Sequence, residues 1–264
     1  MLLRMLKSAL SKPQPQAAAV AVAPVERAEA AFRNPHYQRH NARRQEHLAT
    51  LGLDLANRTV LEVGAGVGDH TTFFLDRDCR VTSAEPRHEN VELFAATLQK
   101  HLRLGYAKAA NCTLVEADVE SIGAKVGGTF DVVYCYGLLY HVEDPGAVLA
   151  TLAGHCGDLL LLETRVSSGA NEAIHPMLED KALPSNTVHG KGCQPTRPWI
   201  FSTLKKLFAH VYVPRTQPAH EEFPLDWTVD YPVEQLTRAV FVASRRPLAN
   251  PLLLDHLPAR QTRA

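Results

Sequence analysis

The stretch Thr59-Val-Leu-Glu-Val-Gly-Ala-Gly-Val-Gly-Asp69 decides the fold of this chain. Its first five residues are mostly apolar and β-branched, which is typical of a buried strand. Gly64, Gly66 and Gly68 follow at once, and a helical pattern begins near Asp69. Glycine lets the backbone turn tightly and approach a ligand, while the first amides of the next helix supply hydrogen-bond donors. The stretch therefore predicts a strand, a ligand-binding turn and a helix in succession.

The obvious competing interpretation of this turn is a nicotinamide-binding motif. That motif has the spacing G-x-G-x-x-G, whereas the glycines here are spaced G-x-G-x-G. Asp69 occupies the position of the motif's third glycine. A side chain at that position disfavours the close approach of helix and strand, and the pyrophosphate seat, that a dehydrogenase needs.

Strand-like and helical segments alternate through the rest of the chain. Further strands are expected at residues 80–84, 112–116, 130–136, 158–163, 210–214 and 238–243. Helices are expected at 69–76, around 91–102, after the Asp144-Pro145 start signal and near Pro198. Regular alternation of this kind predicts an α/β fold: a Rossmann-like, doubly wound, mostly parallel sheet with helices on both faces.

Charge and composition narrow the class of protein. The 264 residues carry 28 basic and 28 acidic side chains, but residues 61–199 hold eleven Lys/Arg against eighteen Asp/Glu. An acidic middle disfavours a large nucleic-acid partner and favours a small-molecule substrate. The five cysteines show no CxxC spacing, which predicts reduced thiols in a cytoplasmic protein without a zinc site. No apolar run reaches the ~18 residues of a membrane span.

Shifts in composition suggest three parts. Residues 1–27 are expected to be a flexible N-terminal tail and linker, with residues 1–12 either frayed or a weakly amphipathic helix that touches a membrane surface. Residues 28–246 form the expected domain, and residues 247–264 a C-terminal tail. Within the domain, the polar stretch 166–218 interrupts the regular alternation of strands and helices. It predicts a substrate-binding or lid insertion. Nothing in the sequence indicates the oligomeric state.

Two carboxylates follow strands of the predicted sheet. Glu85 ends the second strand, and Asp118 comes directly after the third. Because the carboxyl ends of parallel strands meet at one edge, both should lie near the glycine turn. A carboxylate at such a strand end can accept two hydrogen bonds from a ribose diol. These features together predict a site for a nucleoside-type ligand.

At this point the sequence resembles the class I S-adenosylmethionine-dependent methyltransferases. The resemblance rests on Val60–Thr71, Thr82–Pro86, Glu116–Ser121 and Asp131–Pro145. It implies a seven-stranded sheet whose last strand, residues 238–243, is antiparallel. It also implies S-adenosylmethionine as the cofactor, with the following residues around it: Glu62, Gly64, Ala65, Gly66 and Gly68 at the methionine and ribose part, Glu85 and Pro86 at the ribose, Asp118 and Val119 at the adenine, and Tyr136 and Gly137 beside the sulfonium.

Several residues are candidates for the remaining chemistry. His141 follows the fourth strand at the ligand-binding edge, and an unperturbed histidine suits general-base work. His189 in the polar stretch is the alternative base, and ordering of a turn is the alternative role of His141. The segment 35–44 precedes the sheet and has two equal interpretations: a helix over the cofactor, from which Tyr37 or Arg43 reaches the methionine carboxylate, or a solvated basic helix. Methyl transfer from a sulfonium requires no metal, and none is expected.

These observations predict a methyltransferase that acts on a small molecule, with a hydroxyl oxygen of a sugar or related metabolite as the acceptor. One alternative is a tRNA wobble-uridine carboxymethyltransferase, which the stretch Gly137–Pro145 also resembles. That group uses a carboxylated cofactor and needs an arginine near the transferred group, which the sequence does not locate. A second alternative is a non-catalytic subunit that only binds the cofactor.

Overall fold

The computed structural model describes residues 23–232 and 235–264. The expected amphipathic helix at residues 1–12 and most of the expected linker therefore lie outside the described residues. Within the described part, no helix combines the length and apolar character that crossing a membrane requires. The five cysteines all fall in this part, and all are free thiols, as expected.

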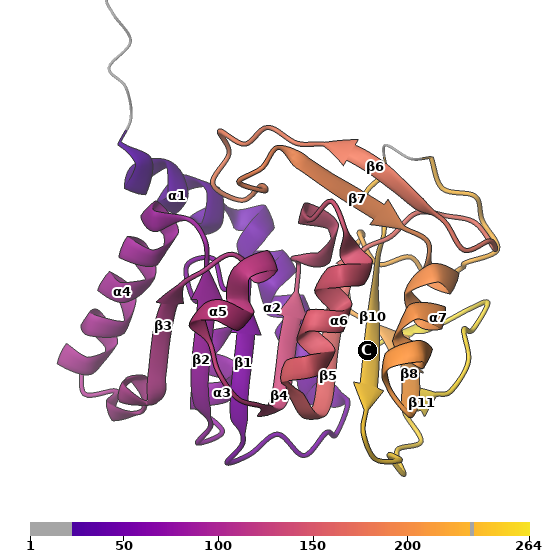
Figure 1. The fold of residues 1–264 in the computed structure, drawn as a ribbon, viewed down its shortest axis with the longest axis horizontal. Helices are drawn as coiled ribbons and strands as arrows, with labels where there is room; N and C mark the ends of the chain where they lie inside the picture. The colour runs from indigo at the N-terminus through magenta and orange to yellow at the C-terminus, as the bar shows by residue number, and fades with distance from the viewer. Residues whose placement is uncertain (1–22, 233–234) are drawn as a thin grey trace, which may run out of the picture.

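An eight-stranded sheet in the order β11-β8-β10-β5-β4-β1-β2-β3 forms the centre of the molecule (Figure 1). Its strands are β1 (Thr59–Val63), β2 (Arg80–Glu85), β3 (Cys112–Glu116), β4 (Phe130–Tyr136), β5 (Cys156–Arg165), β8 (His210–Pro214), β10 (Arg238–Ser244) and β11 (Leu253–Leu254). Strands β1 to β5 are parallel, and β10 is antiparallel to both β5 and β8. The predicted doubly wound, mostly parallel sheet is confirmed. It has eight strands rather than seven because the two-residue β11 pairs with β8.

Helices cover both faces of this sheet. They are α1 (Pro24–Arg33), α2 (Pro35–Thr50), α3 (Thr71–Leu75), α4 (His88–Arg103), α5 (Ile122–Lys125), α6 (Pro145–His155) and α7 (Arg197–Leu207), with short 3₁₀ turns η1 (Ala107–Asn111), η2 (Val119–Ser121) and η3 (Leu139–His141). Helices α5, α6 and α7 cover the face that Figure 1 presents, and α2 and α3 lie behind it. Two apolar cores result, one between each layer of helices and the sheet.

Helix α6 begins at the Asp144-Pro145 pair, as the sequence predicts. The Asp144 side chain accepts a hydrogen bond from the Ala147 N–H at 2.9 Å, and Pro145 opens α6.

Along α4 the expected apolar face is only partly buried: Phe94 is buried, whereas Leu102 is 37 % exposed. The reason is position, since α4 lies beside β3 at the edge of the sheet, where α1 and the short turn η1 are its main neighbours besides the sheet.

Two small sheets lie outside the main one. Strands β6 (Ile174–Leu178) and β7 (Lys191–Pro195) form an antiparallel hairpin, which lies across the edge where the parallel strands end (Figure 1). This hairpin falls within the polar insertion predicted at 166–218. The loop between its strands, residues 179–190, is called the lid segment below.

The C-terminal residues are part of the fold, so the predicted tail at 247–264 is wrong. Strand β12 (Thr262–Arg263) pairs with β9 (Thr216–Gln217), and Leu253 and Leu254 pair with β8. The buried side chain of Gln261 accepts hydrogen bonds from Gln217 and from the Trp227 indole. Too few apolar residues in this segment repeat with a helix or strand period for the sequence to show that it packs.

Candidate functional site

A cavity of about 460 Å³ opens at the carboxyl edge of the parallel strands, beneath the hairpin and the lid segment. This volume lies within the range of about 300–1,000 Å³ that is usual for small-molecule sites. The cavity is lined by most of the predicted site residues: Gly64, Gly66, Glu85, Pro86, Asp118, Val119, Tyr136, Gly137 and His141. The topology brings them together, because each follows a strand that ends at this edge.

Two backbone hydrogen bonds attach the glycine turn to the end of the neighbouring strand β2. The N–H groups of Gly64 and Ala65 both donate to the Ala84 carbonyl, at 2.9 and 3.1 Å. Gly64 and Gly66 have φ angles of 69° and 56°, a region that residues with a side chain rarely adopt. The turn can therefore place bare backbone at the cavity wall, as predicted from the glycine spacing.

Glu85 joins the turn to the end of β2. Its Oε2 accepts the Gly66 N–H at 2.9 Å, and its Oε1 accepts the Arg87 N–H at 3.1 Å and the Asn90 amide at 2.9 Å. Burial raises the pKa of this carboxyl, and the three hydrogen bonds oppose that rise. Each oxygen can accept more than one hydrogen bond, so a fixed carboxylate faces the cavity and can accept from a diol.

Asp118 occupies the corresponding position after β3. Its Oδ1 accepts the Glu120 N–H at 2.9 Å, and its Oδ2 lies 3.0 Å from Nε2 of His189. His189 is therefore held beside the predicted adenine-binding carboxylate. That position speaks against its alternative role as the base, because the base must reach the acceptor beyond the sulfonium.

Three predicted cofactor residues do not line this cavity. Glu62 points into the layer between the sheet and α3, where its Oε2 accepts the hydroxyls of Thr71 and Ser83 at 2.5 and 2.7 Å. Burial raises its pKa to about 7. Glu62 and Ala65 line a separate space of about 20 Å³, and Gly68 packs against the Phe94 ring. The geometry gives these three residues a supporting position beneath the turn.

His141 and Glu179 form a pair in the wall of the cavity. Nδ1 of His141 lies 2.6 Å from Oε2 of Glu179, and both side chains are nearly buried, at 11 % and 7 % exposed. The same Glu179 oxygen accepts the Thr187 N–H at 3.0 Å. Burial raises the pKa of the Glu179 carboxyl, but these hydrogen bonds outweigh it and the pKa is lowered. An ionised Glu179 holds the proton on Nδ1, which leaves Nε2 as the basic nitrogen.

Helix α2 supplies a wall of the cavity that sequence reasoning foresaw only in part. Tyr37 lines the cavity, and burial raises its pKa to about 12. Arg43 does not line it: that side chain is on the outer surface and pairs with Glu46 at 2.6 Å. The prediction for Arg43 is wrong, and Arg44 lines the cavity instead, because successive helix positions are rotated by 100°.

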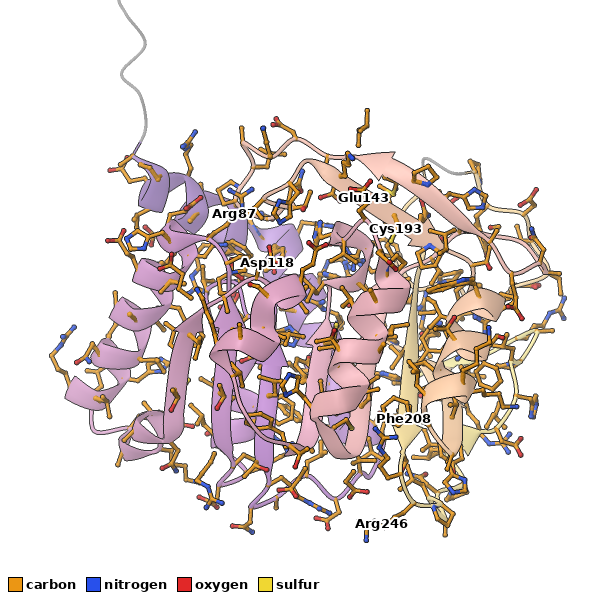
Figure 2. All side chains as sticks on the ribbon, viewed as in Figure 1. Arg87, Asp118, Glu143, Cys193, Phe208 and Arg246 are labelled. Carbon is orange, nitrogen blue, oxygen red and sulfur yellow. The ribbon has the colours of Figure 1, made fainter. Side chains whose placement is uncertain are left out.

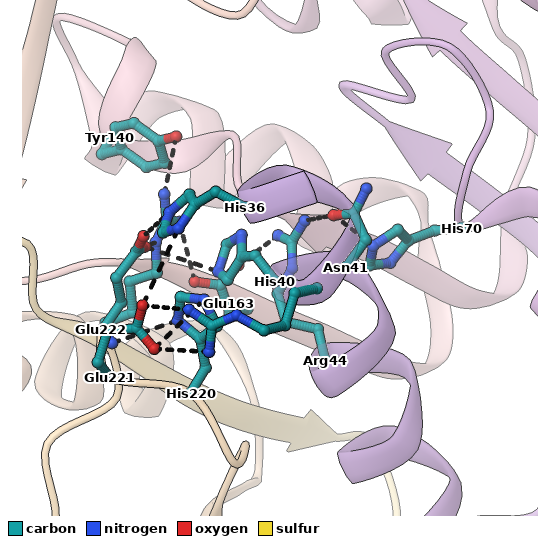
Figure 3. A network of polar contacts seen from close by, with 12 residues as sticks. His36, His40, Asn41, Arg44, His70, Tyr140, Glu163, His220, Glu221 and Glu222 are labelled. Carbon is teal, nitrogen blue, oxygen red and sulfur yellow. Dashed lines mark hydrogen bonds and ion pairs between the residues drawn. The ribbon is translucent and has the colours of Figure 1, made fainter. Parts of the chain in front are cut away.

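Buried arginines and glutamates underlie the part of the cavity beside α2 and β10, which is called its acceptor side below (Figure 3). Glu163 at the end of β5 is fully buried and contacts Arg44 at 2.8 Å and Arg238 at 3.1 Å. Arg238 also donates from Nε to Glu222 at 2.6 Å and from Nη2 to the Tyr140 hydroxyl at 3.2 Å. These residues come from α2, η3, β5, β10 and the loop before β10, so no local spacing in the sequence could reveal them.

Arg165 is a further cation at this end of the cavity. Its side chain lines the cavity, and no hydrogen bond or ion pair joins its guanidinium to any side chain or carbonyl of residues 23–232 and 235–264. Burial lowers its pKa. A half-buried guanidinium that lacks a partner among the described residues would be stabilised by an anion. Arg165 therefore favours a ligand that carries an anionic group.

The lid segment is fastened to the end of β2. Arg87, which lies at the carboxyl edge in Figure 2, donates to the carbonyls of Lys181, Asn186 and Thr187 at 2.7, 3.1 and 3.1 Å. The Asn90 amide donates to the Pro184 carbonyl at 3.1 Å. Of the insertion predicted at 166–218, the lid segment lies over the cavity, whereas residues 197–207 and 210–214 form α7 and β8 of the main domain.

Residues 61–156 match the family described as methyltransferase domain. The chain contains a class I S-adenosylmethionine-dependent methyltransferase domain. The predicted family is therefore confirmed, and the matched segment runs from β1 to the end of α6.

Curated relatives match this methyltransferase domain and its surroundings. A ubiquinone biosynthesis O-methyltransferase of Psychrobacter arcticus is 31 % identical over 39 % of this chain and 38 % of its own length. A tRNA U34 carboxymethyltransferase of Alteromonas mediterranea is 33 % identical over 46 % of this chain and 36 % of its own length. The chain thus spans less than half the length of these relatives.

Solved structures share the fold of the methyltransferase over most of the chain. The N-terminal domain of EvdMO1, determined with SAH and D-fucose, superposes with a TM-score of 0.59 at 22 % identity over 81 % of this chain and 85 % of that one. Magnesium protoporphyrin IX methyltransferase of Synechocystis with bound SAH gives a TM-score of 0.57 at 16 % identity over 84 % and 94 %. At these identities the likeness concerns the fold.

Proposed function

We propose that this protein transfers a methyl group from S-adenosylmethionine to a hydroxyl oxygen of a small molecule such as a sugar. The His141–Glu179 pair carries the proposal: a histidine with Nδ1 held by a carboxylate lies in the same cavity as the glycine turn and Glu85. The cavity can thus hold a nucleoside-type cofactor at one end and an acceptor beside a base at the other.

The residues at the cofactor end fit S-adenosylmethionine. Glu85 can accept from the ribose hydroxyls, Asp118 and Val119 flank the adenine position, and the bare turn at Gly64 and Gly66 admits the ribose and methionine part. Tyr136 and Gly137 lie at the end of β4, beside the expected sulfonium position. When bound, the cofactor supplies an electrophilic methyl group on a sulfonium and departs as a neutral thioether.

His141 then has a defined role as the base. Nε2 takes up the hydroxyl proton of the acceptor as its oxygen bonds to the methyl carbon, and the electrons of the broken carbon–sulfur bond remain on sulfur. Glu179 stabilises the imidazolium that results. The fold shared with the EvdMO1 domain, determined with D-fucose, supports a sugar as the first acceptor class to screen.

Calorimetry and a methyl-transfer screen test this function. Wild-type protein is expected to bind S-adenosylmethionine and S-adenosylhomocysteine, and Glu85→Gln to weaken both at least tenfold. The matched control Glu92→Gln alters a surface carboxylate of α4 and should bind as wild type does. Once an acceptor is found, His141→Gln should keep cofactor affinity and lose turnover. Binding of neither cofactor form by the wild type would refute the proposal.

A second candidate is favoured by Arg165. Relatives named tRNA U34 carboxymethyltransferase match the chain, and the carboxylate of a carboxylated cofactor could pair with this guanidinium. Parallel titration with S-adenosylmethionine and its carboxylated form decides between the two. Tighter binding of the carboxylated form, lost in Arg165→Gln, would favour carboxymethyl transfer. Equal or weaker binding would leave methyl transfer as the function.

A further inference from the structure

Three histidines and two glutamates gather at the acceptor side of the cavity: His36, His40, His220, Glu221 and Glu222 (Figure 3). His36 and His40 are four residues apart on α2 and therefore lie on the same face of that helix. The other three residues belong to the loop between β9 and β10. His36, His40 and Glu222 also line the cavity.

The ligand atoms of this cluster form two overlapping groups that share His220: His40, His220 and Glu222 in one, and His36, His220 and Glu221 in the other. Nε2 of His36 lies 3.1 Å from Oε1 of Glu222, and Nε2 of His40 lies 3.7 Å from Oε2 of the same residue. One ligand atom from each of His40, His220 and Glu222 can be chosen so that all three lie within 4.8 Å of one another. Ligands at about 2.1 Å from a tetrahedral ion stand about 3.4 Å apart, so these three atoms would move closer together, and His36 would turn toward them, to surround one ion.

A second observation points to a ligand at this place. Nε2 of His40 and Nε2 of His220 are both buried and have no hydrogen-bond partner among the described residues. The His40 and His220 side chains are only 5 % and 0 % exposed. Buried polar atoms normally have a partner, and a neutral imidazole nitrogen is the commonest metal ligand in proteins.

We propose that His40, His220 and Glu222 bind one divalent transition-metal ion at the wall of the cavity, and that His36, which lies 3.1 Å from Glu222, completes the ligand set. A set of three imidazoles and one carboxylate suits Zn²⁺ and its neighbours in the first transition row, and suits Mg²⁺ or Ca²⁺ poorly. Arg238 donates to Oε2 of Glu222, the oxygen that lies 3.7 Å from His40, and Oε1 faces His36, so each oxygen of this carboxylate lies beside one of the two histidines of α2. Glu163 offsets the charges of Arg44 and Arg238, which lie nearby.

The site departs from the expectation, drawn from the sequence, that no metal is bound. The two pairs of ligands are about 180 residues apart, so no spacing motif could bring them together in the sequence. Its position suggests a role in catalysis, because the ion would face the acceptor end of the cavity and hold an acceptor hydroxyl. That role rests on the proposed function, whereas the metal site itself does not.

Metal titration of the full chain tests the inference. Protein dialysed against a chelator is titrated with Zn²⁺ and binding is followed by calorimetry. A parallel titration with Co²⁺ is followed by visible absorption, which is strong when the ion has four or five ligands. We expect one equivalent bound, with affinity at least a hundredfold weaker in His40→Gln and in His220→Gln. His36→Gln alters a side chain that is 57 % exposed and should fold even if the others do not; it should weaken binding at least tenfold.

Two controls locate the ion. His256→Gln alters an exposed histidine that pairs with Asp255 and should bind metal as the wild type does. His189→Gln disrupts the other cluster of side chains with suitable ligand spacing, Asp118, Glu120 and His189, and should also retain binding. Loss of binding in His189→Gln with retention in His36→Gln would overturn the inference, as would absence of a stoichiometric site in the wild type.

Cofactor titration of the same samples separates the two proposals. Protein that binds S-adenosylmethionine but no metal contradicts the metal site alone. Protein that binds metal at the cluster but neither cofactor form contradicts the proposed function and leaves the site standing.

Discussion

Asp69 replaces the third glycine of a nicotinamide-binding turn, and its contacts show what a side chain does at that position. Oδ2 accepts the Asn41 amide at 3.0 Å, Oδ1 pairs with Arg33, and the backbone carbonyl accepts the Gln45 amide at 2.9 Å. All three partners belong to α1 and α2. The aspartate thus fastens the preceding helices over the glycine turn, where a dehydrogenase would need open space for pyrophosphate.

Gly68 supports the turn from beneath and yields a prediction at the residue scale. Its φ is 82°, and a Cβ added there would lie 2.2 Å from the Phe94 ring. We expect Gly68→Ala to lower the free energy of unfolding by about 2–5 kcal/mol, from backbone strain plus overpacking. Gly105→Ala is the control: its φ is 87° but no atom lies within 4 Å of the added Cβ, so only strain remains. Equal losses by urea denaturation would contradict this account.

The pKa of Glu62 predicts a dependence of stability on pH. The pKa rises from 4.5 to about 7 in the folded state through burial, so the folded protein keeps a proton that the unfolded chain releases between these values. The contribution of Glu62 to the free energy of unfolding is fully present below pH 4.5. It falls by about 3 kcal/mol as the pH rises to 7. Glu62→Gln should therefore gain stability relative to wild type over this range. Urea denaturation of both proteins across this pH range checks it, and two profiles of the same shape would show the prediction to be wrong.

Among the elements, α2 shows where sequence reasoning reaches its limit. Strands β1 to β5 were predictable because apolar, β-branched runs are local and bounded by turn residues. Glu85 and Asp118 were predictable from the strand ends they follow. The polar sequence of α2 carries no comparable signal for which side chains face the cavity. The sequence points to Tyr37, which lines the cavity, and to Arg43, whereas the arginine that lines it is Arg44. The contacts of Glu163 and Arg238 depend on tertiary pairing that no local pattern encodes.

The hairpin depends on one close backbone approach, which yields a prediction at the scale of the element. A Cβ added to Gly192 in β7 would lie 2.4 Å from the Tyr140 carbonyl in η3. Gly192→Ala should therefore push the hairpin away from η3 and speed amide hydrogen exchange in residues 139–141 and 191–195. The control Gly154→Ala adds a methyl group to α6 in open space and should leave exchange there unchanged. Unaltered exchange in Gly192→Ala would argue against this contact.

Across the whole molecule, Glu163 connects the first half of the chain to the last. Its two arginine partners lie on α2 and β10, 119 and 75 residues away. Glu163→Gln leaves these buried guanidinium groups without their shared carboxylate and should lower the free energy of unfolding by about 3–5 kcal/mol. Glu221→Gln is the control, since its ion pair with Arg39 is exposed and should matter much less. Urea denaturation of both variants checks this, and similar losses would contradict it.

The lid segment has attachments at both ends of the cavity. Arg87 and Asn90 hold it above the cofactor end, and Glu179 ties it to His141 at the acceptor end. One segment of the chain therefore contacts the residues on both sides of the cavity, so its displacement would uncover both at once. If the protein transfers methyl groups as proposed, the methylated product and the thioether would both depend on the same movement of the lid segment to leave the cavity.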